Sequence, residues 1–214
     1  DLPLSRGLGD VYKRQDKRIG NKFLHPGPGY GGSCFPKDTL ALVRTAQEHD
    51  VSVGIVNEVV KYNDLRKKSM SQRVIDALNG NVKGKMIAVL GLAFKPETDD
   101  MRDSPSLEII PHLLSAGAHI KVYDPKAMDE AKRLLGDPVS FSDSAEACVH
   151  DADAVVLVTE WNEFRALTPD HYISLLKGNT MVDLRNIYSS EEMVRSGLDY
   201  HSIGRPEEKK LHDV

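Results

Sequence analysis

Apolar residues recur along the chain in two different patterns, and the first of them predicts a long helix. Between residues 53 and 78 the apolar side chains include Val56, Val60, Met70, Val74 and Leu78, which follow one another mainly at steps of three and four. This spacing marks one face of a helix. About 26 helical residues would span on the order of 40 Å. Both a strut between domains or across a dimer and a long core helix fit this pattern.

Beyond residue 81, short apolar runs alternate with amphipathic segments. Strands are predicted at 86–90, 119–123, 154–159, 180–184 and 200–203, and helices at 106–116, 127–135, 144–150, 169–176 and 191–196. Short apolar strands that alternate with helices are typical of a parallel sheet covered on both faces. The sequence therefore predicts an α/β protein, in which a helical central segment precedes a Rossmann-like parallel sheet domain.

These patterns predict four regions in the chain. Residues 1–15 lack periodicity and join oddly to the segment that begins at residue 16, so we interpret them as a foreign or misassembled leader. A helical domain with the long helix is expected at 16–80, and Gly80 is its expected C-terminal cap. The sheet domain is expected at 81–205, and the polar tail at 206–214 is expected to fray.

A run rich in glycine and proline, HPGPGYGGSCFPKD, lies before the first predicted helix. Because glycine permits unusual backbone angles and proline stiffens the path, we expect residues 17–37 to be neither helix nor strand. Asp38 is the expected N-cap of a helix from Thr39 to His49. The run fits an ordinary surface loop as well as a binding loop.

Cys34 lies within this run and is a candidate nucleophile. A cysteine reacts as the thiolate, which a positive or dipolar neighbourhood favours. Lys37 and the predicted helix N-terminus supply both features, and Gly31 and Gly32 leave room for a ligand. The local sequence also fits a small buried residue, which is the role we expect for Cys148.

The loop at 91–105 and Arg185 are candidate ligand contacts. The loop follows a predicted strand and opens a helix with Ser104 as the expected N-cap, an arrangement that binds anions. Lys95 and Arg102 add positive charge. A dinucleotide fingerprint is missing, because only Gly91 stands in place and the acidic candidate Asp124 lies farther on than the roughly 20 residues expected. Arg185 follows a strand, and a surface arginine in a salt bridge is its alternative role.

The composition is that of an ordinary globular protein. The formal net charge is -4 and the pI is about 6.1, which do not indicate a partner among nucleic acids or membranes. No apolar run approaches the roughly 18 residues of a membrane span. Two cysteines cannot build a disulfide framework, so a cytoplasmic location is expected. The histidines show no metal-ligand spacing with the cysteines, so no metal site is expected.

Several stretches together resemble the UDP-glucose 6-dehydrogenase family. They are residues 16–24 (DKRIGNKFL), 26–38 (PGPGYGGSCFPKD), 89–95 (VLGLAFK), 99–104, 122–125 (VYDP), 159–164 (TEWNEF) and 182–186. The likeness extends over about residues 16–204, and GGSCFPKD is its most specific part. Tyr30, Phe35 and Pro36 are more similar to the UDP-glucose enzymes than to their GDP-mannose or UDP-N-acetylmannosamine relatives.

The resemblance implies an NAD-dependent, two-step oxidation of UDP-glucose to UDP-glucuronate. Cys34 would be the nucleophile that forms a thiohemiacetal and then a thioester, and Asp38 would assist proton transfer and the attacking water. Cys34, Lys37 and Arg102 would meet NAD. Arg18 would reach the substrate of a neighbouring subunit, which implies a homodimer through the central helix. The remaining substrate contacts would be His25, Pro26, Gly27, Pro28, Gly29, Tyr30, Gly31, Phe94, Lys95 and Arg185, and the sheet domain would bind UDP.

Two alternatives remain open. The chain could be a UDP-sugar-binding or dimerisation module without turnover, or it could act on another nucleotide sugar such as GDP-mannose or UDP-N-acetylmannosamine. The family's N-terminal NAD-binding domain, with its catalytic lysine, asparagine and glutamate, has no counterpart in this sequence.

We therefore predict that the chain has no dehydrogenase activity by itself, because hydride transfer needs a bound acceptor. The purified 214-residue chain would be incubated with UDP-glucose and NAD, and NADH would be followed by its absorbance. No NADH is expected. Steady NADH production would contradict the prediction.

Overall fold

The structure, a computed structural model, describes residue 15 and residues 25–205. The predicted tail, most of the predicted leader and Arg18 lie outside the described residues. The helices are α3 (Cys34–Glu48), α4 (Gly54–Ala77), α5 (Ser106–Ser115), α6 (Met128–Leu135), α7 (Ala145–Val149), α8 (Asn162–Arg165), α9 (Pro169–Leu175) and α10 (Ser190–Arg195). The strands are β1 (Met86–Leu90), β2 (His119–Tyr123), β3 (Val139–Phe141), β4 (Ala154–Leu157), β5 (Thr180–Asp183) and β6 (Asp199–Ser202).

The six strands form one parallel sheet in the order β3-β2-β1-β4-β5-β6. Alternate residues of each strand face opposite sides. In β1, Ile87 and Val89 join a core cluster with α4, α5 and α6, whereas Ala88 and Leu90 join a second cluster with α7, α9 and α10. Because both faces are covered by helices, the two central strands, β1 and β4, are wholly apolar. The predicted α/β class with a Rossmann-like parallel sheet is confirmed.

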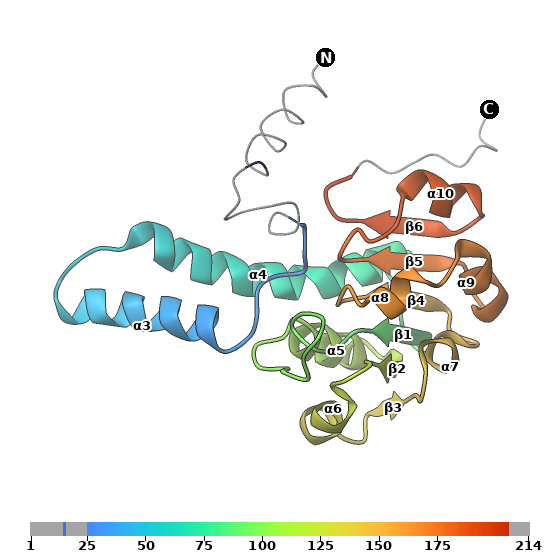
Figure 1. Cartoon of the computed structure of the whole chain (residues 1–214), viewed down its shortest axis with the longest axis horizontal. Helices are drawn as coiled ribbons and strands as arrows, with labels where there is room; N and C mark the ends of the chain where they lie inside the picture. Colours follow the sequence, from blue (N-terminus) through green and yellow to red (C-terminus); the bar gives the residue numbers. More distant parts are fainter. Residues whose placement is uncertain (1–14, 16–24, 206–214) are drawn as a thin grey trace, which may run out of the picture.

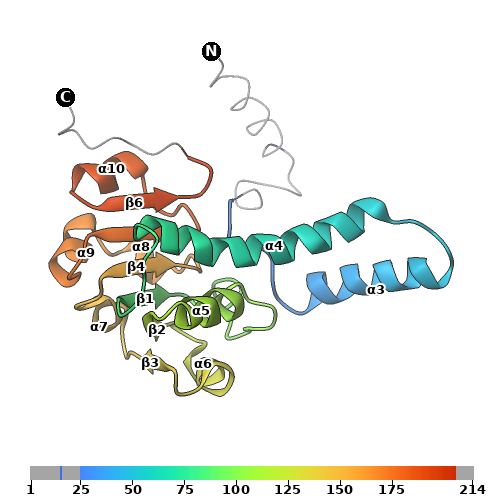
Figure 2. The same cartoon turned by 180° about the vertical axis from the view of Figure 1, so that it is seen from behind.

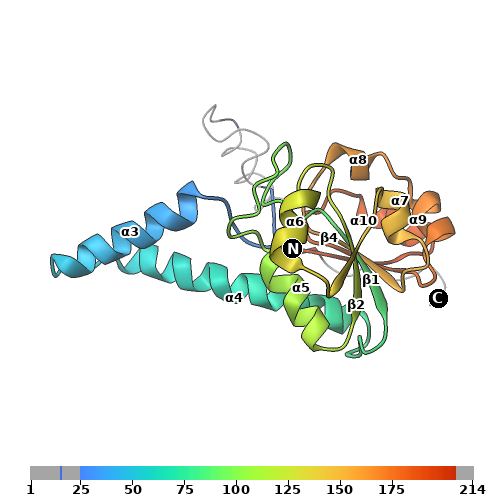
Figure 3. The ribbon, with the colours of Figure 1, turned by 90° about the horizontal axis from the view of Figure 1, so that it is seen from below.

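The long helix α4 runs from the sheet into solvent. With α3 it forms an antiparallel pair that projects from the sheet domain (Figures 1 and 2). The outer end is its N-terminal half, and its C-terminal half packs on the sheet domain beside α5, as the view from below shows (Figure 3). Val74 in that half is fully buried, whereas Ile55 and Leu65 farther out are 84% and 65% exposed. The interpretation as a core helix therefore holds for the C-terminal half, whereas a strut between domains or across a dimer remains a prediction for the exposed outer half.

Two short elements, one helix start and two helix caps differ from the sequence predictions. Helix α4 has Leu78 as its C-cap rather than Gly80, and α5 has Pro105 as its N-cap rather than Ser104. Strand β3 and helix α8 were not predicted, because three or four residues carry too little periodicity. Helix α3 begins at Cys34, inside the run expected to be irregular, and Asp38 is therefore not its cap. Pro36 fits this first turn because the N–H groups there have no partner within the helix.

Among the described residues, no helix is long and apolar enough to cross a membrane. The division into domains at residue 80 remains a prediction.

The burial of α4 leads to a stability prediction. Val74→Ala should lower the free energy of unfolding by about 2 kcal/mol, because it leaves a cavity between the helix and the sheet. Val51→Ala is the matched control, since Val51 is 59% exposed, and it should change the value by less than about 0.5 kcal/mol. Urea unfolding followed by circular dichroism measures both. Equal effects of the two substitutions would show that α4 is not part of the core.

Candidate functional site

A pocket of about 620 Å³ lies where the glycine-rich segment meets the loops after β1 and β5. Most of the residues predicted to bind substrate line this pocket. Phe35 also lines it, which was not predicted. The predicted residues are His25, Gly27, Gly29, Tyr30, Gly31, Phe94, Lys95 and Arg185. Pro26 lines an adjoining pocket of about 400 Å³ with His25 and Arg185. Pro28 is buried in the described segment and lines neither pocket.

The adjoining pocket lies at the point where the strand order reverses, between β1 and β4. Ligands of open α/β sheets bind at such a switch point, beyond the carboxyl ends of the strands. Pro96 and Glu97 come from the loop after β1, and Glu160 comes from the loop after β4. The two pockets share His25 and Arg185, so together they offer a continuous surface for an elongated ligand.

Asp124 fixes three loops at this edge of the sheet. Its buried carboxylate follows β2 and accepts backbone N–H groups of Leu92 (2.7 Å) and Ala93 (3.1 Å) from the loop after β1. It also accepts the Trp161 Nε1–H at 3.1 Å, and the N–H groups of Lys126 and Ala127 at 2.9 Å each. Both oxygens are thus occupied by protein donors. Asp124 cannot serve a cofactor ribose, unlike the acidic residue of a dinucleotide site.

Arg185 is a fixed part of the pocket wall. Its side chain is 13% exposed, its Nε donates to Val158 O at 2.7 Å, and its Nη2 donates to Phe94 O at 3.2 Å. Glu160 Oε2 lies 3.1 Å from Nε and balances the charge, although the Nε–H points at Val158. Burial lowers the pKa of Arg185, and the carboxylates of Glu160 and Asp183 oppose that shift. Arg185 thus forms a salt bridge, as its alternative role proposed, but it lies largely buried in the pocket wall rather than at the surface.

A second buried carboxylate holds the turn that carries Arg185. Asp183, at the end of β5, accepts the N–H groups of Arg185 at 2.9 Å and Ile187 at 2.8 Å. The Tyr200 hydroxyl donates to it at 2.6 Å, and burial raises the pKa of this tyrosine. These bonds fix the backbone of the turn that carries Arg185.

The glycine-rich segment packs backbone to backbone against the loop that precedes α5. The Gly32 N–H donates to Arg102 O at 2.7 Å. A Cβ at position 31 would lie 2.4 Å from Asp103 O, and one at position 32, where φ is +87°, would lie 2.8 Å from the Phe94 ring. Only glycine allows this approach. The contact brings Cys34 to the edge of the sheet.

Cys34 is the first residue of α3 and is exposed to solvent. It does not line the pocket itself, but its neighbours Gly31 and Phe35 do. Because the helix begins here, Asp38 lies four residues on along the same helical face. The sulfur thus faces solvent at the positive end of a helix of 15 residues, beside a carboxylate.

Two cations predicted to meet a cofactor lie near this sulfur. The side chains of Lys37 and Arg102 are 75% and 69% exposed. Arg102 donates twice to Asp100, at 2.9 and 2.8 Å. The pKa of Arg102 is raised, first by that hydrogen bond and then by the charge of Asp100, with a smaller contribution from Cys34. Both cations remain accessible from the solvent.

The anion site expected at the start of α5 is not open. Ser104 and Ser106 are buried, and both hydroxyls donate to Leu92 O, at 2.6 and 2.7 Å. The N–H groups of Ser106 and Leu107 are taken by Ser104. The helix N-terminus is closed by its own loop, so Lys95 and Arg185 supply the positive charge of the pocket instead.

Sequence reasoning did not identify Asn63 and Arg66, whose side chains hydrogen-bond to the glycine-rich segment. A polar residue on a long, partly exposed helix is ordinary, so the pattern carried no signal for them. The role of Asp124 in fixing three loops was also missed, because a carboxylate that follows a strand is more typical of a ligand contact.

The Asp124 cluster leads to a second stability prediction. Asp124→Asn should lower the free energy of unfolding by about 3 kcal/mol. The substitution replaces one carboxylate oxygen with an NH2 group, so the N–H donors that were bonded to that oxygen lose their acceptor and face another donor. Asp143→Asn removes an exposed carboxylate and is the matched control. Urea unfolding followed by tryptophan fluorescence measures both. If the two variants lost the same small amount, Asp124 would not be the residue that fixes these loops.

Comparison with known proteins places these features in one family. Two of its profiles match the chain: the central domain of the UDP-glucose/GDP-mannose dehydrogenase family at residues 12–65, and its UDP binding domain at residues 88–190. Together they cover well over half of the sequence.

Individual relatives agree with these matches. A UDP-glucose 6-dehydrogenase of Rhizobium meliloti is 52% identical over 204 residues, which are 95% of this chain and 45% of that protein. A UDP-glucose dehydrogenase structure from Pyrobaculum islandicum has a TM-score of 0.75 at 32% identity and covers 91% of this chain and 42% of that one. An NDP-N-acetyl-D-galactosaminuronic acid dehydrogenase structure from Methanosarcina mazei has a TM-score of 0.79 at 28% identity, with 94% and 44% covered. The chain thus spans less than half the length of these relatives. On this basis the chain belongs to the UDP-glucose/GDP-mannose dehydrogenase family, whose reaction is an NAD-dependent oxidation.

Proposed function

We propose that this chain is the UDP-glucose-binding part of a UDP-glucose 6-dehydrogenase and carries its nucleophile, Cys34. The observation that carries the proposal is the pocket in which eight of the predicted substrate contacts converge, with the exposed sulfur beside it. The high identity to UDP-glucose 6-dehydrogenases supports the choice of sugar nucleotide.

The pocket suits an anionic, elongated ligand. Lys95 is exposed, lies 5.3 Å from the centroid of the Phe94 ring, and can place its ammonium on a phosphate oxygen. Arg185, held by backbone carbonyls, would contact the uridine side. The backbone of residues 25–31 would wrap the glucosyl-phosphate part, where glycine allows close approach.

Cys34 would act on the aldehyde formed at C6 of the sugar. Its thiolate adds to the carbonyl carbon, and the carbonyl oxygen takes a proton, which gives a thiohemiacetal. Loss of a hydride from C6 and of the hydroxyl proton leaves a thioester. Water then adds to the thioester carbon, the C–S bond breaks, and a carboxylate and the thiolate remain. Asp38, on the same face of α3 as Cys34, is suited to accept the proton of that water.

Two NAD molecules, bound one after the other, would each accept one of the two hydrides that this oxidation releases. The sheet of this chain does not fit a dinucleotide, because Asp124 is occupied by protein donors. Lys37 and Arg102 do fit an anionic cofactor that approaches Cys34 from the solvent side. They would hold one edge of the cofactor and leave the sulfur open to the sugar.

We also propose that two copies associate through the central helices. Helix α4 exposes apolar side chains over its outer half, among them Ile55 (84%), Tyr62 (64%) and Leu65 (65%). Such a contiguous apolar surface is typical of an interface. A second copy would cover it and could bring Arg18 to the neighbouring substrate.

Ligand binding provides the test of the proposed function. Isothermal calorimetry should show that UDP-glucose binds this chain more tightly than GDP-mannose or UDP-N-acetylmannosamine. Lys95→Met should weaken UDP-glucose binding roughly tenfold, because a charged contact with phosphate is lost.

Lys132→Met removes an exposed cation on α6 and is the matched control, which should bind as the parent chain does. Unchanged affinity of the Lys95 variant would rule out the assigned pocket. Tighter binding of another nucleotide sugar would show that this sugar nucleotide, and not UDP-glucose, is the substrate.

A further inference from the structure

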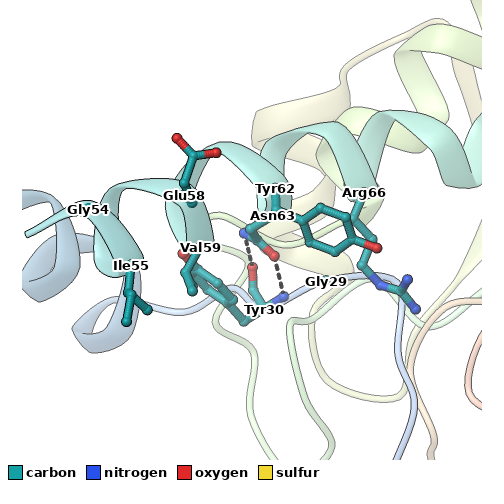
Figure 4. A pocket seen from close by; sticks show the side chains of 9 residues that line it. All are labelled: Gly29, Tyr30, Gly54, Ile55, Glu58, Val59, Tyr62, Asn63 and Arg66. Carbon is teal, nitrogen blue, oxygen red and sulfur yellow. Dashed lines mark hydrogen bonds between the residues drawn. The ribbon is translucent and has the colours of Figure 1, made fainter.

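One face of α4 holds the glycine-rich segment from outside the pocket. Asn63 and Arg66 lie three residues apart in this helix and therefore share a face. Both side chains reach the main chain of residues 27–30 rather than any side chain. Figure 4, which is drawn around a neighbouring pocket on the α4 side of this segment, shows the two bonds between Asn63 and Tyr30. The segment thus has α4 on one side and the pocket on the other.

Asn63 pairs with both polar groups of one residue. Its Oδ1 accepts the Tyr30 N–H at 2.8 Å, and its Nδ2 donates to Tyr30 O at 3.1 Å. The side chain is part of a residue that is only 6% exposed, so water cannot replace either bond easily. Among residues of this size and shape, only an amide carries both a donor and an acceptor at its end.

Arg66 fixes the other end of the same stretch. Its Nε and Nη2 both donate to Gly27 O, at 2.9 and 2.7 Å. Between the two anchors, Gly29 has a φ of +136°, and a Cβ there would lie 2.9 Å from both Asn63 Oδ1 and Lys67 Cγ. The segment therefore lies directly on the helix, with no room for a side chain at this position.

This anchoring decides which way one backbone donor points. A trans peptide unit directs its C=O and its N–H to opposite sides. Because the Tyr30 C=O points to Asn63, the N–H of Gly31 points away from α4. No backbone acceptor among residues 25–205 takes that N–H, and Gly31 lines the pocket. The arrangement leaves a donor on the pocket side of the segment.

We propose that Asn63 and Arg66 are positioning residues of the nucleotide-sugar site. They hold the backbone at 27–31 so that the Gly31 N–H is presented to an oxygen of the sugar-phosphate part of the ligand. Neither side chain needs to touch the ligand. This inference rests on the proposed function, since it assumes that the pocket binds a nucleotide sugar.

The test compares UDP-glucose with UMP, which keeps the uridine and its first phosphate but lacks the glucosyl-phosphate part. Asn63→Asp keeps the acceptor for the Tyr30 N–H but loses the donor for Tyr30 O and repels that carbonyl, so the 30–31 peptide should rotate. Calorimetry should show UDP-glucose affinity reduced roughly tenfold, while the affinity for UMP changes by less than about twofold. Arg66→Lys keeps the charge but loses the paired donors, so a smaller loss with the same selectivity is expected.

Gln72→Glu makes the same amide-to-carboxylate change at an exposed position of α4 and is the matched control. It should leave both affinities unchanged. The inference is overturned if the folded Asn63 variant binds UDP-glucose as the parent chain does, or if UMP binding falls by the same factor. Should Asn63→Asp fail to fold by circular dichroism, Arg66→Lys decides by the same two criteria. Failure of the parent chain itself to bind UDP-glucose would reject the proposed function, and the inference would fall with it.

Discussion

The site depends on a contact between two backbones. The glycine-rich segment approaches the loop after β1 so closely that Gly31 has Asp103 O where a Cβ would be, and the Gly32 N–H is bonded to Arg102 O. That contact joins the helical part of the chain to the sheet. It places Cys34, at the start of α3, beside a loop from the middle of the sequence. A single methyl group at either glycine would force the two parts of the site apart.

The remaining parts of the site are made rigid by groups that do not face the ligand. Asp124 and Asp183 are buried at the carboxyl ends of β2 and β5, and each accepts several protein donors. They order the loops that carry Lys95 and Arg185. This use of Asp124 also explains how a sheet with the strand order of a dinucleotide-binding fold can serve a different ligand. The acidic group that would bind a ribose is consumed within the protein.

The amino-acid sequence predicts most of the fold because the central strands are wholly apolar and the long helix repeats apolar residues at steps of three and four. Strand β1 was predicted with the bounds it has, and α4 to within a residue at each end. The start of α3 was missed because glycine and proline argue against a helix, although a first turn tolerates Pro36. The pocket residues could be named from a family resemblance. The contacts of Asn63 with Tyr30 could not, because they join residues 33 positions apart through a polar side chain without a distinctive pattern.

The central claim is that Cys34 and the pocket of Lys95 and Arg185 form one site. The most direct measurement is the rate at which iodoacetamide alkylates Cys34 in the presence of increasing UDP-glucose, read by mass spectrometry. Cys148 is an internal control, because it is buried and its pKa is raised to about 12 by that burial. The account predicts that UDP-glucose slows alkylation of Cys34, with half of the full protection at the dissociation constant found by calorimetry. An unchanged rate at UDP-glucose concentrations that fill the pocket would contradict it.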